Sequence, residues 1–301
     1  MKQLTPSAFA KAVDYIAQNA RPLEKARFAY HFEGGSGNAV LEALTAFQNA
    51  DGGFGHGLEP DLRLPASSVI ATTIAFQHFR ELGLASDHPI VVSACRYLLD
   101  TYDVDHHNWQ IVPPNVSDAP HAPWWTFRDE LTPINPRAEI AGYLLDYPDH
   151  FPDSMRLPVV DAVMHLLLEH PDTMEMHDLL CYLRLLKTPA LPPEDRARMQ
   201  RKLERILAGS VERDPARWRE YGLPPLAVVS APDSPFAAMF QDAIPANLDL
   251  ILDSQSDHGG WLPSWTWGED SSPAWEQAKR EWSGVITLDS LRTLRAFGRL
   301  G

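Results

Sequence analysis

The chain has 301 residues, an apolar fraction of 45% and a formal net charge of −14, so it is long enough for one large domain or two smaller ones. A strongly acidic surface repels nucleic acid and anionic membranes, which argues against most polyanion-binding functions. The two cysteines, Cys95 and Cys181, show no CxxC spacing, so neither a structural zinc site nor a disulfide framework is expected.

Apolar periodicity and helix-breaking residues predict an all-α chain of about twelve helices. In chain order they cover residues 6–19, 22–33, 38–49, 67–82, 88–101, 136–146, 157–169, 175–187, 193–208, 222–230, 243–254 and 283–297. The element at 222–230 is the shortest, because Pro224 and Pro225 leave room for little more than one turn.

An internal repeat connects two distant parts of the chain. Residues 48–54 and 255–261 share a glutamine, two glycines and an aromatic residue in the same register. The helices that follow also align, with Ser68, Thr72, Phe76, Phe79, Leu82 and Gly83 matching Ser283, Thr287, Leu291, Leu294, Phe297 and Gly298. The paired glycines permit positive φ and hence a sharp turn between antiparallel helices. We expect Gln48 and Gln255 to tie the ends of each loop together.

The repeat also predicts that successive helices alternate between the inner and the outer layer of a ring. If this alternation continues along the chain, the helices form six pairs of one inner and one outer helix. This predicts an (α/α)6 toroid as a single domain over residues 1–301. The long connections at 50–66, 102–135, 209–221 and 255–282 would then crowd one mouth of the ring. Every tryptophan falls in, or at the end of, such a connection: Trp109, Trp124, Trp125, Trp218, Trp261, Trp265, Trp267, Trp275 and Trp282.

The first candidate catalytic segment is the glycine-rich loop that follows Gly53. His56, Glu59 and Asp61 lie within six residues of one another in this loop. A pair of carboxylates that flanks a substrate can act as acid and base, or as acid and nucleophile. The alternative is a loop that is held together by local pairing with Arg63.

Asp105 and Glu139 are the other two candidate catalytic residues. Asp105 lies in segment 103–109, whose two carboxylates and two imidazoles do not match a recognised metal cage. No cofactor is therefore predicted. Ligation of a divalent metal by this segment stays open although the spacing does not support it, and the alternative is a solvated loop. Glu139 lies in the first turn of an inner helix, where the helix dipole stabilises a carboxylate, so capping alone also explains it.

The residues expected to bind substrate are those that bring aromatic or imidazole rings to the mouth of the ring. They are His56, Trp124, Trp125, His258, Trp261, Trp265 and Trp282. Indole faces suit an isoprenoid chain, a carbocation or a sugar ring. Arginines are also expected on this side, but they are too scattered to predict a phosphate site: Arg21, Arg27, Arg63, Arg128 and Arg137.

The two copies of the repeat resemble the repeats of the α/α-toroid superfamily of terpenoid cyclases and protein prenyltransferases. Squalene-cyclase-like members carry similar Gln…Gly-x-Trp motifs. The resemblance covers residues 48–83 and 255–298 and implies a toroid with a pocket at the inner-helix mouth. The Asp-x-Asp-Asp acid of the cyclases is not matched, because segment 103–106 keeps only two of its acids. The prenyltransferase zinc ligands are not matched either.

Three functions remain open at this point. The first is a toroid enzyme that acts in a tryptophan-lined pocket on an isoprenoid-type or other apolar-faced substrate by carboxylate acid catalysis. The second is a saccharide-active hydrolase or lyase with a carboxylate pair, and the third is a non-catalytic binding ring. We expect a small-molecule substrate and a cytoplasmic protein without a membrane span, because no stretch approaches the roughly 20 apolar residues that a span requires. The oligomeric state is left open.

Overall fold

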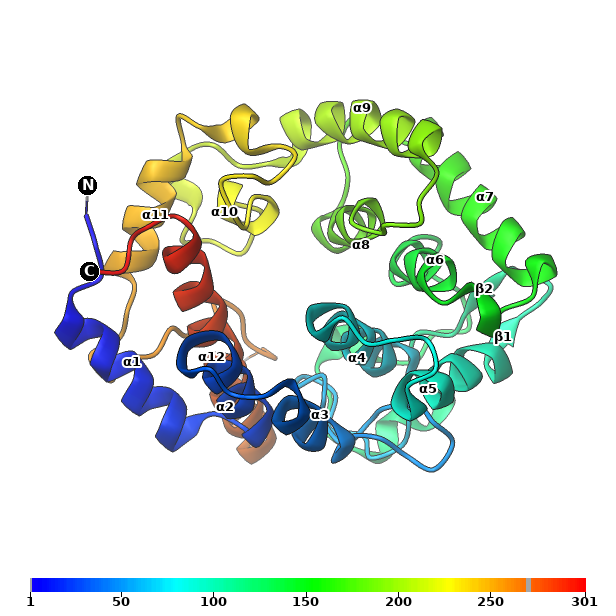
Figure 1. Ribbon diagram of the computed structural model, residues 1–301, viewed down its shortest axis with the longest axis horizontal. Helices are drawn as coiled ribbons and strands as arrows, with labels where there is room; N and C mark the ends of the chain where they lie inside the picture. Colours follow the sequence, from blue (N-terminus) through cyan, green and yellow to red (C-terminus); the bar gives the residue numbers. More distant parts are fainter. Residues whose placement is uncertain (1, 269–271) are drawn as a thin grey trace. The chain divides into compact units, whose positions relative to one another are not determined.

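The computed structural model describes residues 2–268 and 272–301, and these fold into twelve α-helices with a single two-stranded sheet (Figure 1). The predicted all-α class is therefore confirmed. The helices are α1 (Pro6–Asn19), α2 (Pro22–Phe28), α3 (Gly37–Thr45), α4 (Val69–Leu82), α5 (Pro89–Asp100), α6 (Arg137–Asp146), α7 (Asp153–Glu169), α8 (Met176–Leu186), α9 (Pro193–Ser210), α10 (Pro225–Val228), α11 (Ile244–Asp253) and α12 (Pro273–Ala296). The sheet pairs β1 (Tyr102–Asp103) with β2 (Asn108–Trp109) in antiparallel order. No helix of the described part is long and apolar enough to cross a membrane.

The chain divides into two compact units. Unit 1 combines residues 1–44 with residues 211–301, and unit 2 covers residues 45–210. Unit 1 thus holds α1, α2, most of α3 and α10 to α12, whereas unit 2 holds α4 to α9 and the sheet. The predicted closed ring and the predicted single domain stay predictions.

Unit 1 is assembled from the two ends of the chain. The Leu4 amide donates to the Arg299 carbonyl at 2.7 Å, and the Gly301 amide donates to the Leu4 carbonyl at 3.0 Å. Arg299 is buried and forms an ion pair with Asp249 at 2.6 Å. The two termini therefore lie beside each other, and α1 packs against α12 (Figure 1).

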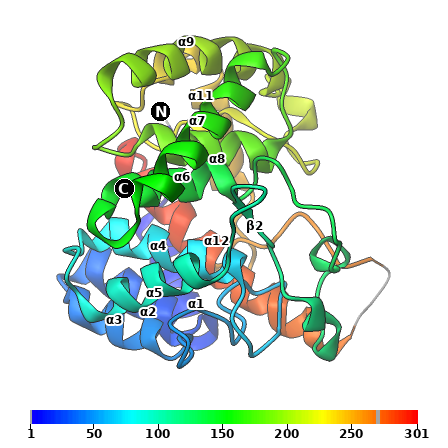
Figure 2. The same ribbon diagram turned by 90° about the vertical axis from the view of Figure 1, so that its right-hand side faces the viewer.

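Unit 2 is centred on α6, which packs against α7 and α8 (Figure 2). Nine of the ten residues of α6 are buried, so this helix has no solvent-facing stripe. Phe76 of α4 stacks on Tyr143 of α6, with ring centroids 4.7 Å apart. The two repeats of the sequence contribute to different units, since α4 belongs to unit 2 and α12 to unit 1.

The repeat loop of unit 2 has the bracing predicted from its glutamine. The Gln48 amide group donates to the Gly52 carbonyl at 3.0 Å and to Ser93 Oγ on α5 at 2.9 Å. The Phe54 amide donates to Thr72 Oγ1 at 3.1 Å, which fixes the loop to the next helix.

The repeat loop of unit 1 copies this pattern. Gln255 donates to the Gly259 carbonyl at 2.8 Å and to the Ala8 carbonyl on α1 at 2.9 Å. The Trp261 amide donates to Thr287 Oγ1 at 3.0 Å. Each repeat therefore includes a third helix, α5 in unit 2 and α1 in unit 1, which the sequence alignment did not include because α1 lies at the opposite end of the chain.

Some helix boundaries differ from the prediction, most of all the start of α12. We predicted that this helix begins at residue 283, but it begins ten residues earlier, at Pro273. The Ser272 side chain accepts a hydrogen bond from the Trp275 amide at 3.2 Å, and Pro273 occupies the first helical turn. Trp275 and Trp282 are consequently helix residues, and the prediction that a loop extends to residue 282 is wrong.

Candidate functional site

The loop between Phe54 and Ser68 places two carboxylates in a buried position. The two ends of the loop meet at an antiparallel bridge between Phe54 and Ser68. Glu59 is only 5% exposed and Asp61 only 2% exposed. The Asp61 amide donates to Glu59 Oε1 at 3.2 Å, so the Glu59 side chain is folded back over the same turn. The loop therefore buries both acidic residues at one turn.

A second loop segment, residues 120–126, is hydrogen-bonded to this carboxylate loop. The Ala122 amide donates to the Asp61 carbonyl at 2.8 Å, and the Arg63 amide donates to the Pro120 carbonyl at 3.0 Å. Trp124 and Trp125 follow directly after these bonds. The structure thus places the segment with two predicted catalytic carboxylates beside the segment with two predicted substrate-binding tryptophans, and both segments belong to unit 2.

The two tryptophans of this segment have different environments. Trp125 packs against an apolar cluster made of Leu62, Leu64, Val112 and Val116. Its indole Nε1 is buried and has no hydrogen-bond partner among the described residues. Trp124 is 45% exposed and presents its ring to solvent. A buried donor without an acceptor and an exposed ring are both features that a bound ligand would use.

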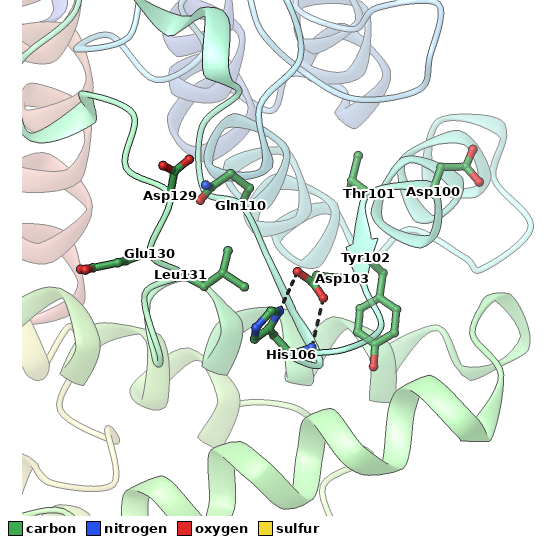
Figure 3. Close-up of a pocket in the computed structure, with 9 residues that line it drawn as sticks. All are labelled: Asp100, Thr101, Tyr102, Asp103, His106, Gln110, Asp129, Glu130 and Leu131. Atoms are coloured by element: carbon green, nitrogen blue, oxygen red, sulfur yellow. Dashed lines mark hydrogen bonds and ion pairs between the residues drawn. The ribbon is translucent and has the colours of Figure 1, made fainter.

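His56 and Asp105 lie at the surface. His56 Nε2 lies 2.9 Å from Asn49 Oδ1, and its backbone adopts a positive φ of 54°. Asp105 belongs to the exposed turn between β1 and β2, where the Asp103 carboxylate accepts the amides of Asp105 and His106 at 3.0 Å each. The His106 ring lies 2.9 Å from the same carboxylate, which lowers the pKa of Asp103 (Figure 3).

Glu139 is buried in a network of donors between α4, α6 and α8. Gln77 Nε2 donates to Oε1 at 2.8 Å, and the Tyr143 hydroxyl donates to the same oxygen. Arg184 Nη1 donates to Oε2 at 3.0 Å, and the Cys181 thiol lies 3.9 Å from that atom. Both carboxylate oxygens are therefore occupied by side chains of the protein.

The electrostatics of this network favour a neutral thiol and a neutral phenol. Burial, reinforced by the Glu139 carboxylate, raises the pKa of the Cys181 thiol well above its ordinary value. The same two causes, in the same order, raise the pKa of the Tyr143 hydroxyl. Both groups therefore keep their protons and donate to Glu139, which fits a bracing function for this cluster better than nucleophilic chemistry.

Comparison with models of protein families and with curated proteins finds no match to this chain.

Unit 1 contains the remaining predicted substrate-binding residues, and two of them meet. The rings of Trp265 and Trp282 lie edge to face, with their centroids 5.2 Å apart. The Tyr221 ring also contacts Trp265 edge to face, with the two ring centroids 6.1 Å apart. The Trp282 indole Nε1 is buried and has no partner among residues 2–268 and 272–301. Tyr221 was not predicted as a site residue, because nothing near it in the sequence indicated that it contacts Trp265.

Trp261 and His258 differ in burial, since Trp261 is buried and His258 is exposed. Trp261 is 3% exposed, and its indole donates to the Ile251 carbonyl at 2.7 Å, so it is a core residue of the repeat loop. His258 is exposed and lines an open hollow of about 440 Å³ beside Lys11 and Tyr15 of α1. Across the described ranges, no group of three or more His, Cys, Asp or Glu side chains is placed to hold a metal ion.

Proposed function

We propose that this chain is an enzyme of the α/α-toroid type in which the carboxyl groups of Glu59 and Asp61 supply the acid. The observation that carries the proposal is the burial of both groups in one loop that is hydrogen-bonded to the Trp124–Trp125 segment. Acidic side chains are seldom fully buried without a functional or structural reason. Carboxyl groups shielded from water beside aromatic rings serve as general acids in several enzyme classes.

A substrate with apolar faces suits the surroundings of Glu59 and Asp61. The Trp125 ring belongs to an aliphatic cluster, and an indole face stabilises a cation that develops near it. An isoprenoid-type substrate that is protonated by Glu59 or Asp61 uses both features. A tryptophan segment that is hydrogen-bonded to the loop of the two buried acids therefore supports a cyclase-like function.

A saccharide-active hydrolase or lyase is the second candidate, and the exposed ring of Trp124 favours it. Sugar rings stack on exposed indoles, and a pair of carboxylates is the usual machinery of glycoside hydrolysis. The two candidates share the same acids, so one set of variants tests both.

The test is a turnover assay on purified protein with two substrate panels, linear isoprenoids and oligosaccharides, read by mass spectrometry. We expect Glu59→Gln and Asp61→Asn to abolish turnover while the helical circular dichroism signal is retained. The matched controls are Glu169→Gln and Asp161→Asn on the exposed face of α7. Turnover that persists in both loop variants, or that falls as far in the controls, removes the loop from the active site.

A further inference from the structure

Arg137 is a buried cation without a hydrogen-bond or ion-pair partner among the residues that the structure describes. It is the first residue of α6 and only 8% exposed. Its guanidinium forms no hydrogen bond and no ion pair with any residue in the described ranges, and its Nε atom is fully enclosed. Buried charges are almost always paired, because desolvation of an isolated ion costs several kcal/mol.

The polar groups around Arg137 do not compensate its charge. The ionisable groups that act on it are the hydroxyls of Tyr102 and Tyr182, and burial lowers the pKa of the guanidinium. The Tyr182 hydroxyl donates to the Val163 carbonyl at 2.8 Å. The Tyr102 hydroxyl lies 2.7 Å from Nδ1 of His107. Neither tyrosine is an anion at neutral pH, so the positive charge remains unbalanced.

The carboxylates of the surrounding helices are engaged elsewhere. Glu139, two residues further along α6, is paired with Arg184. Asp146, at the end of α6, is paired with Arg80 at 2.6 Å. Asp178 of α8 accepts a hydrogen bond from the backbone of Asn135. Although the chain has a net charge of −14, none of these three carboxylates pairs with Arg137.

The position of Arg137 at a helix start adds a second attraction for an anion. The ten-residue helix α6 begins after Pro136, and no side chain caps its first turn. The positive end of the helix dipole favours negative charge at this point. The buried guanidinium and the uncapped helix start thus both favour an anion beside the first turn of α6.

We propose that Arg137 binds the carboxylate of a small organic acid. The planar fork of a guanidinium matches the two oxygens of a carboxylate. One unpaired cation balances one negative charge, so a monoanion fits better than a doubly charged phosphate.

The test measures binding of acetate and benzoate to the full chain by titration calorimetry at fixed ionic strength, with inorganic phosphate at pH 8 as the competing anion. We expect saturable binding of the carboxylates to the wild-type chain and weaker binding of phosphate. Arg137→Met should weaken carboxylate binding about tenfold or more, because a charge-assisted bidentate pair is lost. Arg201→Met, an exposed arginine on α9, is the matched control and should bind like the wild type.

A second measurement keeps the proposal testable if Arg137→Met does not fold. In the wild-type chain, the NMR signal of one arginine Nε–H group should shift on titration with benzoate, and Arg137→Lys should remove that signal. Absence of saturable carboxylate binding to the wild type overturns the proposal. Equal affinity in Arg137→Met, or tighter binding of phosphate than of acetate, also overturns it.

Discussion

Gly52 offers the sharpest test of how the repeat loop is held against its third helix. Its φ is +88°, and a Cβ atom at this position would lie 2.2 Å from the Ser93 carbonyl oxygen on α5. Gly83, at the end of α4, also has a positive φ, +63°, but a Cβ there would meet no atom within 4 Å. Substitution of each glycine by alanine therefore separates backbone strain from close approach within the same unit.

The expected magnitudes follow from these two surroundings. A non-glycine residue in the left-handed region costs about 1–2 kcal/mol, so Gly83→Ala should lower the free energy of unfolding by that amount. Gly52→Ala carries the same strain and also forces the loop away from α5. Overpacking of this kind costs about 1–3 kcal/mol more, and loss of the bond between Gln48 and Ser93 adds about 1 kcal/mol. Gly52→Ala should therefore lower stability by about 3–6 kcal/mol.

The assay is urea denaturation followed by circular dichroism, with the midpoint and the slope of the transition compared between variants. The corresponding pair in unit 1 provides a replicate, because a Cβ on Gly259 would lie 2.3 Å from the Lys11 carbonyl oxygen, whereas Gly298 has open space. The reasoning is refuted if Gly52→Ala is no more destabilising than Gly83→Ala. It is equally refuted if the order is reversed within the pair of unit 1.

Two further predictions concern buried titratable groups in unit 2. Glu139→Gln should lower the free energy of unfolding by about 2 kcal/mol. The amide accepts from fewer donors than the carboxylate and leaves Arg184 without its charged partner. A free energy of unfolding equal to that of the wild type in urea denaturation would contradict this prediction. Burial raises the pKa of the Cys95 thiol to about 12, so Cys95 should not react with a thiol reagent at pH 8 until the chain is unfolded. The Cys95 thiol keeps its proton in the folded state, whereas in the unfolded state it loses the proton above its ordinary pKa of about 8.5. The free energy of unfolding should therefore be unaffected by this group below about pH 8.5 and should fall as the pH rises towards 12.

The control for Glu139→Gln is Glu169→Gln, which changes an exposed carboxylate on α7 and should leave the urea midpoint unchanged. The reactivity of Cys95 is checked by counting the thiols that react before and after addition of denaturant. Rapid modification of Cys95 in the folded chain would show that the helix around it opens to solvent.

The sequence determined the elements of this protein well, because they depend on local patterns. Apolar periodicity, proline positions and glycine caps predicted twelve helices, and the single-turn element near Pro225 was expected from its prolines. The glutamine and paired glycines of the repeat predicted a braced loop, since a bond between Gln48 and Gly52 spans only four residues. The start of α12 was missed because Ser272 and Pro273 cap a first turn whose residues show no clear apolar stripe.

The candidate site depended on contacts that no local pattern encodes. The sequence named Glu59, Asp61 and the pair Trp124–Trp125, but only the tertiary structure showed that Asp61 and Ala122 share a hydrogen bond. Glu139 was predicted from its place in the first turn of a helix, whereas its surroundings come from helices α4 and α8.

Arg137 illustrates the same division most clearly. Its residue type and its place near the start of a helix could be read from the sequence, together with four other arginines that looked equivalent. Whether an arginine is solvated, paired or buried alone depends on the side chains that long-range packing brings around it. The sequence therefore determined which segments are helical, with the start of α12 as the exception, and the packing of distant segments decided which charges are paired within the protein.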